Sequence, residues 1–370
     1  MKKIGLMTLH HDKSSFGACL QGFALWHYLS QNNDCEMVNL PVTKNKEHQE
    51  TLIIHIKVLI AKCLTFLKNF RKPEYKKALY DSKVRIKNFE TFNSLIKMSN
   101  KCWTKEEIYQ DPPSYDVWVS GSDQLWNPRI YFDIEPYLLG FTRDEDKRVS
   151  YASSLGVLEI EPNYEQLFKY AIPRFHSVAM REASAIPVIQ RYTNVKIENV
   201  LDPTFLLSKD EWRTFAKPID VQKRYLICYF LSYTSEIISF CKKQAESLKL
   251  TPLFISTKTD DVLVFPNVQF IQYAGPSEFV YLIDNSDFVL TDSFHGTVFS
   301  IISEKQFITY IGRNIKASSR ITNMLTSLGI PDNVLSSLQI KNSNIDYDVV
   351  RKHLAKRITE SKDYLNKSIG

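Results

Sequence analysis

Short apolar segments that look like buried strands alternate with helical patterns along most of the chain, and this alternation constrains the fold more than any other feature. The segment KIGLMTL (3–9) is typical of a buried strand, and residues 18–31 follow with apolar side chains at helical spacing. Strand-like segments recur at 115–121, 148–156 and 177–180. A strand, a polar loop and a helix begin a βαβ unit, so a parallel sheet is expected.

The same alternation restarts near residue 224. Further helical patterns separate the strands predicted in this second series, which are 224–231, 252–257, 268–273, 287–292 and 306–311. Two successive series predict an α/β chain with two Rossmann-like domains that face each other across a cleft.

The domain boundary is expected between the two series. We expect an N-terminal Rossmann-like domain over 1–212, on the acceptor side, with a helical insert at about 47–100. A C-terminal Rossmann-like domain, on the donor side, is expected over 213–345. Residues 346–370 are predicted to form a C-terminal helix that packs back on the N-terminal domain. A chain of 370 residues is long enough for two buried cores.

Charge, cysteine usage and hydropathy narrow the function classes. The formal net charge of +6 favours anionic partners, but the basic residues are dispersed and no recognition module is visible, so nucleic-acid binding is not expected. The six cysteines contain no C-x-x-C pair, which favours reduced thiols in a cytoplasmic protein. Three lysines interrupt the apolar window 51–70, and the start lacks a signal-peptide pattern, so neither a membrane span nor secretion is expected.

The stretch TDSFHGTVFSI (291–301) places His295 just after the predicted strand 287–292 and at the start of a helix. In open parallel sheets ligands collect beyond the carboxyl ends of strands, where helix N-termini offer free N–H groups. His295, with the hydroxyls of Ser293 and Thr297, is therefore a candidate anion site, and a histidine also suits proton transfer near neutral pH. The alternative is a histidine that only caps the helix or packs in the core.

A second polar cluster ends the strand in VWVSGSDQLWNP (117–128). Gly121 allows a tight turn, while Ser122, Asp123 and Gln124 offer hydrogen bonds to a polyhydroxy or phosphorylated ligand. The alternative is a helix N-cap formed by Ser122 or Asp123.

A third cluster, VAMREAS (178–184), places Arg181 at a strand end, and the arginine fork matches a carboxylate or phosphate. The alternative to ligand binding is that Arg181 forms a salt bridge with Glu182 or another surface acid. The following LDPTFLL (201–207) offers Asp202, which we interpret mainly as part of a structural join between the domains.

The loop within HHDKSSFGACLQGFAL (10–25) joins the first strand to the first helix, and its Ser15 and Gly17 are candidates to contact a phosphate or a sugar. It lacks both the G-x-G-x-x-G spacing and the GK[ST] ending, so a nicotinamide or ATP site is not expected. His10 and His11 are adjacent and would point to opposite faces of a strand, so no metal site is expected.

Taken in order, these motifs resemble one known family. The segments FGACLQGFAL, VSGSDQLWNP, SYASSLG, REAS, DPTFLL and TDSFHGTVFSI resemble the polysaccharide pyruvyl transferase family from residue 4 to residue 312. Its members are similar to the two-domain GT-B fold of nucleotide-sugar glycosyltransferases, and they use phosphoenolpyruvate to place a pyruvate ketal across two hydroxyls of a sugar. The resemblance implies a pyruvyl transferase of polysaccharide biosynthesis that acts on a surface polysaccharide, such as an exopolysaccharide, or on its lipid-linked precursor. It further implies that phosphoenolpyruvate is a co-substrate and that no cofactor or metal is needed.

The resemblance also implies roles for the motif residues. Arg181 and His295 are expected to bind the donor, and Asp123 is expected to orient or deprotonate the sugar, so these three are the catalytic candidates. The other donor-binding candidates are Ser293, Gly296 and Thr297. The acceptor-binding candidates are Ser15, Gly17, Ser122, Gln124 and Trp126.

Two other functions stay open on the sequence alone: a GT-B glycosyltransferase that uses a nucleotide sugar, and a non-catalytic saccharide-binding relative. The expected location is cytoplasmic, with peripheral contact at the inner face of the membrane. Residues 51–77, with Arg71, Lys72, Lys76 and Lys77, would suit an anionic membrane surface. The alternative is that this segment packs on the N-terminal domain as an amphipathic helix.

Overall fold

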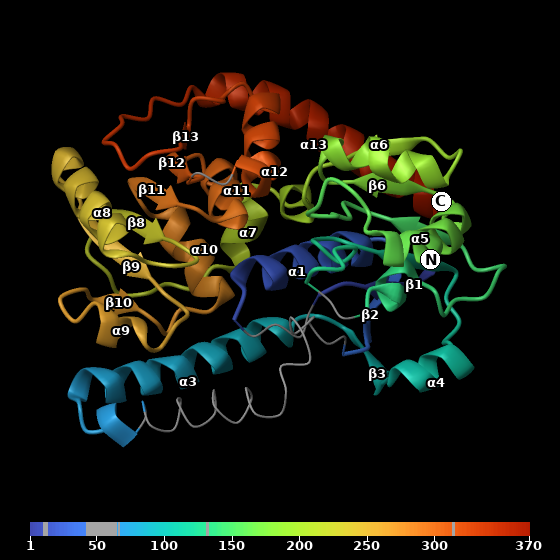
Figure 1. Cartoon of the computed structure of the whole chain (residues 1–370), viewed down its shortest axis with the longest axis horizontal. Coiled ribbons are helices and arrows are strands. Elements are labelled where there is room, and N and C mark those ends of the chain that lie inside the picture. Colours follow the sequence, from blue (N-terminus) through green and yellow to red (C-terminus); the bar gives the residue numbers. More distant parts are fainter. Residues whose placement is uncertain (10–13, 42–64, 66, 131–132, 313–314) are drawn as a thin grey trace.

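In the computed structural model the chain forms two halves, each built on a parallel β-sheet (Figure 1). The structure describes residues 1–9, 14–41, 65, 67–130, 133–312 and 315–370, without the side chains of 315–319. Most of the predicted helix 51–70, and the pair His10 and His11, lie outside the described residues.

The first sheet has five parallel strands in the order β3-β2-β1-β4-β5. Strand β4 is buried at every position, as expected where helices cover both faces of a parallel sheet. The sequence pattern predicted β1, β4 and β5 but missed β2 and β3, because polar residues interrupt the apolar run in both. The bounds are β1 Lys3–Met7, β2 Asp34–Asn39, β3 Met98–Cys102, β4 Val117–Ser120 and β5 Arg148–Ser150.

Two short parallel strands, β6 (Val178–Met180) and β7 (Ile197–Asn199), lie next to this sheet. Single bridges from Val149 to Ser177 and from Ser153 to Met180 connect them to it. The carboxyl end of β6 therefore lies beside the carboxyl ends of β4 and β5.

The second sheet has six parallel strands in the order β10-β9-β8-β11-β12-β13. Its core strand β8 is buried at all five positions. The two parallel sheets confirm the predicted α/β class with two Rossmann-like units. The bounds are β8 Tyr225–Tyr229, β9 Thr251–Ile255, β10 Phe270–Ile271, β11 Phe288–Thr291, β12 Gln306–Tyr310 and β13 Val334–Leu335.

Helices connect the strands, and several begin at side chains that cap them. Ser208 and Glu211 form a reciprocal capping box at the start of α7, which satisfies two backbone N–H groups. The α-helices are α1 Phe16–Ser30, α3 Pro73–Asn93, α4 Lys105–Gln110, α5 Glu165–Ala171, α6 Ile186–Ile189, α7 Lys209–Phe215, α8 Ser235–Leu248, α9 Asp261–Val264, α10 Pro276–Asp284, α11 Phe294–Ile302, α12 Ile315–Ser327 and α13 Tyr347–Ile369.

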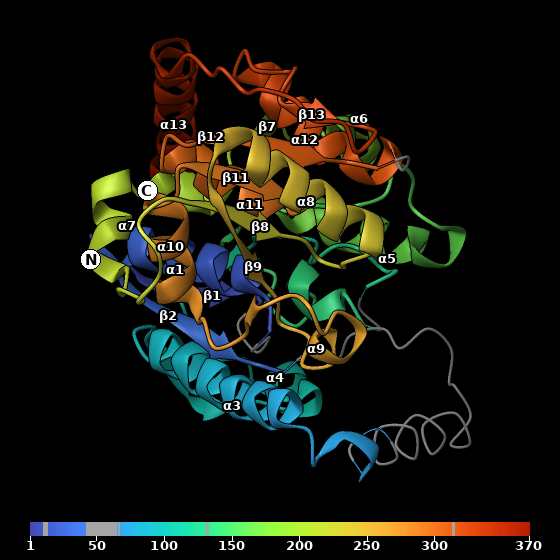
Figure 2. The ribbon, with the colours of Figure 1, turned by 90° about the vertical axis from the view of Figure 1, so that its left-hand side faces the viewer.

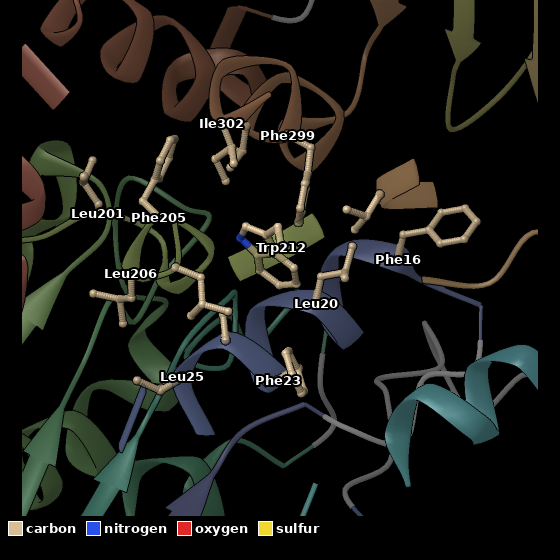
Figure 3. Packing of buried hydrophobic residues seen from close by; sticks show 14 of the residues in the cluster. Phe16, Leu20, Phe23, Leu25, Leu201, Phe205, Leu206, Trp212, Phe299 and Ile302 are labelled. Atoms are coloured by element: carbon tan, nitrogen blue, oxygen red, sulfur yellow. The ribbon is translucent and has the colours of Figure 1, made fainter. Parts of the chain in front are cut away.

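A single hydrophobic cluster runs through both halves, with α1 at its centre. Eleven of the fifteen residues of α1 are buried, so this helix has almost no solvent face. The Phe16 ring of α1 stacks on Phe279 of α10 with 4.5 Å between centroids. Trp212 of α7 lies between α1 and Phe299 of α11 (Figure 3). The two sheets thus share one core instead of meeting at a polar interface.

The C-terminal helix α13 leaves the second half and packs back on the first, as predicted (Figure 1). The Tyr364 hydroxyl donates to the backbone carbonyl of Ser150 at 2.8 Å, and the Ser361 hydroxyl accepts from the N–H of Leu201 at 3.0 Å. At the end of the chain, Lys2 Nζ donates to the carbonyl of Ile369 at 2.5 Å.

Helix α3 falls within the predicted insert of the first half but also contacts the second half (Figure 2). Arg85 donates to the carbonyl of Gln272 at 2.8 Å, and Asn88 donates to the carbonyl of Tyr273 at 3.0 Å. In the part of the chain that the structure describes, no helix combines the length and apolar character needed to cross a bilayer.

Candidate active site

Four of the sequence motifs meet where the carboxyl ends of β4, β6 and β11 approach the N-terminus of α1. Arg181 follows β6, and its two terminal nitrogens contact two carboxylates: Nη1 donates to Asp202 at 2.8 Å and Nη2 donates to Asp123 at 3.0 Å. The side chains of Arg181 and Asp202 are 3% and 0% exposed, whereas Asp123 is 18% exposed. The cation and one carboxylate are therefore internal, and Asp123 is the member that a ligand can reach.

His295 lies on the other side of the Asp202 carboxylate. Its Nε2 is 3.4 Å from Oδ2 of Asp202, the same oxygen that accepts from Arg181, and the residue is 9% exposed. A carboxylate of the chain itself therefore lies between His295 and Arg181, the two residues that we expected to bind the donor.

Asp202 lies on the Nε2 side of the imidazole ring, and Gly17 of α1 contacts the ring on its Nδ1 side. A Cβ at this position would lie 2.0 Å from Nδ1 of His295, so only glycine allows the two to approach this closely. Gly17 is thus in contact with a predicted donor-binding residue, although we assigned it to the acceptor. The imidazole lies beside the first turn of α1 and in the first turn of its own helix α11, where both macrodipoles are positive.

The buried charges hold one another in their ionised forms. Burial by itself would raise the pKa of the Asp202 carboxyl, but His295, Arg181 and the Thr204 hydroxyl together lower that pKa well below its usual range. Burial likewise opposes ionisation of Arg181, yet Asp123 and Asp202 raise its pKa above the ordinary value. The site therefore contains a fixed pattern of full charges near neutral pH.

The backbone of the loop that follows β4 positions the Asp123 carboxylate beside Arg181. Asp123 has a φ of 80°, a left-handed conformation that costs a non-glycine residue on the order of 1–3 kcal/mol. Its carbonyl accepts from Leu125 and Ser154 at 2.8 and 3.0 Å, and these bonds fix the conformation. Just before it, Gly121 has a φ of 138°, and a Cβ there would lie 1.9 Å from the carbonyl oxygen of Tyr151. Persistent backbone strain of this kind is typical of functional loops.

Two of the predicted contact residues point into the protein. Trp126 is fully buried in the core of the first half, and its indole N–H donates to the carbonyl of Tyr137 at 3.1 Å. Thr297 is also fully buried, and its hydroxyl bonds to the Ser293 carbonyl and to Thr309 at 3.0 and 2.8 Å. Both predictions of ligand contact are wrong, because these positions lie past the strand ends on helical or turn backbone that directs them inward.

Two hydroxyls of the site cap helices. Ser293 Oγ accepts from the N–H of Gly296 at the start of α11, and Ser15 Oγ accepts from Ala18 at the start of α1, each at 3.3 Å. Gly296 itself lies against Thr291, where a Cβ would come within 2.4 Å of the hydroxyl. These residues position the helix N-termini that the site uses.

Two further predicted contact residues, Ser122 and Gln124, flank Asp123 in the sequence. Ser122 is fully buried, and its Oγ has no hydrogen-bond partner in the described part of the chain. The Gln124 side chain, turned so that its oxygen faces Arg320, accepts from both terminal nitrogens of that arginine at 3.0 and 3.1 Å.

Sequence reasoning missed three participants. Asp202 both accepts from the Thr204 N–H at 3.1 Å as a cap and pairs with Arg181, so it is more than the structural join that we predicted. Its place after a strand, like that of Arg181, was the available signal. Arg320 comes from α12 and lies 5.8 Å from the Phe294 ring centroid, whereas Arg181 lies 4.7 Å from the same centroid. Phe294 directly precedes His295 at a strand end, but an aromatic side chain there gave no signal of its contact with the arginines, and nothing at a strand end marks Arg320.

Neither a metal site nor a match to a curated protein emerges for this chain. Among the described residues, no three His, Cys, Asp or Glu side chains cluster in a way that would hold a metal ion. No curated protein matches the sequence.

Several solved structures are similar to the chain over almost its whole length. The UDP-GlcNAc 2-epimerase from Methanocaldococcus jannaschii is 11% identical with a TM-score of 0.48, and the match covers 96% of this chain and 92% of that one. The UDP-GlcNAc 2-epimerase from Neisseria meningitidis is 9% identical with a TM-score of 0.44 and coverage of 100% and 94%. An alpha-glucosyltransferase solved with UDP and DNA is 7% identical with a TM-score of 0.46 and coverage of 100% and 95%. Such similarities leave the activity undefined.

A family model gives the assignment that these structures do not. The model described as polysaccharide pyruvyl transferase matches residues 16–314, which is most of the chain, from the first residue of α1 to the loop before α12. The matched range contains Arg181, Asp202 and His295, the three residues joined by the buried carboxylate. The chain belongs to the polysaccharide pyruvyl transferase family and is a transferase enzyme of that type.

Proposed function

We propose that this transferase moves the pyruvyl group of phosphoenolpyruvate onto two hydroxyls of a saccharide and releases phosphate. The observation that carries the proposal is the position of His295, between the buried Asp202 carboxylate and the N-terminus of α1. A phosphorylated donor brings negative charge, and a histidine held beside helix N-termini can bind that charge and supply a proton.

His295 is the proposed contact with the departing phosphate. Asp202 lies on the Nε2 side of the ring, so it fixes the ring orientation and provides a counter-charge for the imidazolium. The Nδ1 side packs against Gly17 in the first turn of α1, and we propose that the donor phosphate binds at the edge of this contact, beside the N-terminus of α1. Arg181 and Arg320 contribute positive charge to the same region, and the amides of the α1 N-terminus are hydrogen-bond donors for an anion.

The proposed reaction balances in protons and bonds. The methylene carbon of the donor takes one proton, and the adjacent carbon then accepts an oxygen from one sugar hydroxyl. The bond from that carbon to the phosphate oxygen breaks, and a second hydroxyl closes the ketal. The two hydroxyls release two protons; one replaces the proton taken by the methylene group and the other leaves with phosphate. Asp123, the exposed carboxylate of the site, is the proposed acceptor of a hydroxyl proton.

The acceptor in this proposal is a sugar of a surface polysaccharide, such as an exopolysaccharide, or its lipid-linked precursor. Ser15 and Gln124 are retained as proposed contacts on the acceptor side, because Ser15 caps α1 and Gln124 follows Asp123 directly. Ser122 is fully buried and is not retained. A cytoplasmic enzyme with peripheral contact at the inner membrane face would meet such a precursor. Cosedimentation with anionic liposomes at low salt tests that contact, and protein that stays in the supernatant contradicts it.

The decisive experiment measures pyruvate incorporation into a saccharide together with phosphate release. We expect His295→Ala to lower transfer by roughly 100-fold or more, because a positioned acid or base contributes about that factor. Gly17→Ala keeps the imidazole but displaces it, so it should lower transfer to a similar degree, since a displacement of about 1 Å can cost on the order of 100-fold.

His353→Ala is the matched control, because His353 is an exposed histidine on α13. Transfer at the wild-type rate by both His295→Ala and Gly17→Ala would exclude the site. Thermal-shift measurements with phosphoenolpyruvate and with a panel of nucleoside diphosphates address the glycosyltransferase alternative. Stabilisation by a nucleoside diphosphate alone would favour that alternative.

A further inference from the structure

A second group of arginines lies behind the active site, around a small cavity that we call the arginine pocket. The cavity has a volume of about 110 Å³ and shares the side chains of Arg181, Asp202 and Phe294 with the site. Its polar lining also includes Glu182, Asn199, Arg320, Asn323, Ser327 and Arg357. Arg320 comes from α12 and Arg357 from α13, so both lie outside the residues that the family model matches.

Among the described residues, neither Arg320 nor Arg357 forms a salt bridge, although the carboxylates of Glu182 and Asp202 line the same cavity. Arg357 donates to neutral oxygens, to Ser327 Oγ at 3.0 Å and to Asn199 Oδ1 at 2.7 Å. Arg320 has the amide oxygen of Gln124 and the ring of Phe294 as its neighbours. Among the described residues, no carboxylate oxygen lies within 4.0 Å of either guanidinium, in contrast to Arg181.

Both guanidinium groups are held in an environment that disfavours charge. Burial lowers the pKa of Arg320 and the neighbouring Arg181 lowers it further, against smaller opposing effects of Asp123, Glu182 and Asp202. Burial also lowers the pKa of Arg357, against a smaller opposing effect of Glu360. Arginine nevertheless stays protonated in proteins, so three cations face two carboxylates, Glu182 and Asp202, around the pocket, and positive charge is in excess. Such cations gain most from a bound anion.

We propose that the arginine pocket binds a small tetrahedral oxyanion, a phosphate group. Its volume of about 110 Å³ is small, which suits a phosphate group better than a nucleotide. The arginine fork matches phosphate oxygens in pairs, and the amide group of Asn323 adds a neutral donor.

The source of the phosphate rests on the proposed function. A phosphate released beside His295 has Arg181 and Phe294 as the shared wall between the two compartments. The pocket would then take up inorganic phosphate after transfer. If it instead held the phosphoryl group of the intact donor, the donor phosphate would lie on this side of Arg181 and not beside His295. Both sources present the same chemistry to Arg320 and Arg357.

Calorimetric titration of the full-length protein with inorganic phosphate, and separately with phosphoenolpyruvate, tests this proposal. Arg320→Gln and Arg357→Gln should each weaken phosphate binding by about tenfold or more, because each removes charge-assisted hydrogen bonds. Lys356→Gln is the matched control, since Lys356 neighbours Arg357 in sequence but its side chain is 79% exposed, and we expect no change in affinity. Arg320→Lys and Arg357→Lys keep the charge without the fork and should weaken binding by less.

The two titrations separate the sources. Weakened binding of inorganic phosphate with unchanged binding of phosphoenolpyruvate assigns the pocket to the product, and weakened binding of both assigns it to the donor phosphoryl group. Absence of saturable phosphate binding to the wild type, or phosphate affinity unchanged in all four arginine variants, overturns the proposal. Because these titrations involve no turnover, they give an answer even if pyruvyl transfer is not observed.

Discussion

At the scale of single residues, the arrangement of buried charges defines the site. One oxygen of Asp202 accepts from Arg181 at 2.8 Å and lies 3.4 Å from Nε2 of His295, and all three groups are shielded from solvent. Removing Asp202 leaves Arg181 with Asp123 as its only carboxylate among the described residues and leaves His295 without one, and an under-compensated buried charge costs more than the loss of an exposed ion pair. The sequence predicted Arg181 and His295 from their places at strand ends, but it did not predict that a third motif would join them.

Asp202→Asn tests this coupling through the pH dependence of stability. We expect the substitution to lower the free energy of unfolding at neutral pH by about 3–5 kcal/mol, because Arg181 loses a buried counter-ion. The pKa of Asp202 is depressed in the folded protein, so its contribution is present above the unfolded pKa of about 3.9 and is lost as the pH falls through the folded value. The difference between wild type and variant should therefore shrink below about pH 4.

Urea unfolding at pH 7, 4 and 3 measures this difference. Asp111→Asn is the control, because the Asp111 side chain is 91% exposed and its arginine contact is 3.7 Å long. A difference for Asp202→Asn that stays constant over the whole range would contradict the depressed pKa.

At the scale of elements, the apolar helix α1 both contacts the site and packs between the two halves. Its first turn supplies Gly17 to the imidazole, while its buried faces join the two halves through Phe16, Leu20 and Phe23 (Figure 3). Helical spacing predicted the helix itself. It did not predict burial on nearly every side, because that depends on α7, α10 and α11, which are far away in the sequence.

Phe16→Ala tests the packing role of α1. The ring is 1% exposed and contacts Phe89, Tyr229 and Phe279. We expect a loss of about 3–5 kcal/mol in the free energy of unfolding, the usual range for a buried phenylalanine replaced by alanine. Tyr80→Ala on α3 serves as control, because Tyr80 is 68% exposed and should change stability by less than about 0.5 kcal/mol. Equal effects of the two substitutions, measured by urea unfolding, would contradict the shared core.

At the scale of the whole molecule, three connections hold the two Rossmann-like halves together. Helix α1 lies in the common core, α3 donates hydrogen bonds to backbone carbonyls of the second half, and α13 returns from the second half to the first. Two series of strands in the sequence predicted two domains with boundaries at 212 and 345, and those boundaries stay a prediction. What the connections imply is mechanical coupling between the halves.

We therefore expect the chain to unfold in one cooperative transition. Tryptophan fluorescence reports on Trp212 in the shared core and on Trp118 and Trp126 in the first half, while far-UV circular dichroism reports on all helices. The two signals should give the same urea midpoint if the halves unfold together. Two separate transitions, or midpoints that differ beyond error, would indicate that the halves unfold independently.

The sequence by itself determined the alternation of strands and helices, the two parallel sheets and the polar residues at the strand ends, because periodicity and turn chemistry are local properties. Only the tertiary structure decided which of those residues meet. It placed Asp202 between Arg181 and His295, brought Arg320 in from α12, and turned Trp126 and Thr297 into the core. These outcomes depend on backbone direction and on partners distant in the chain, so local sequence patterns do not contain them.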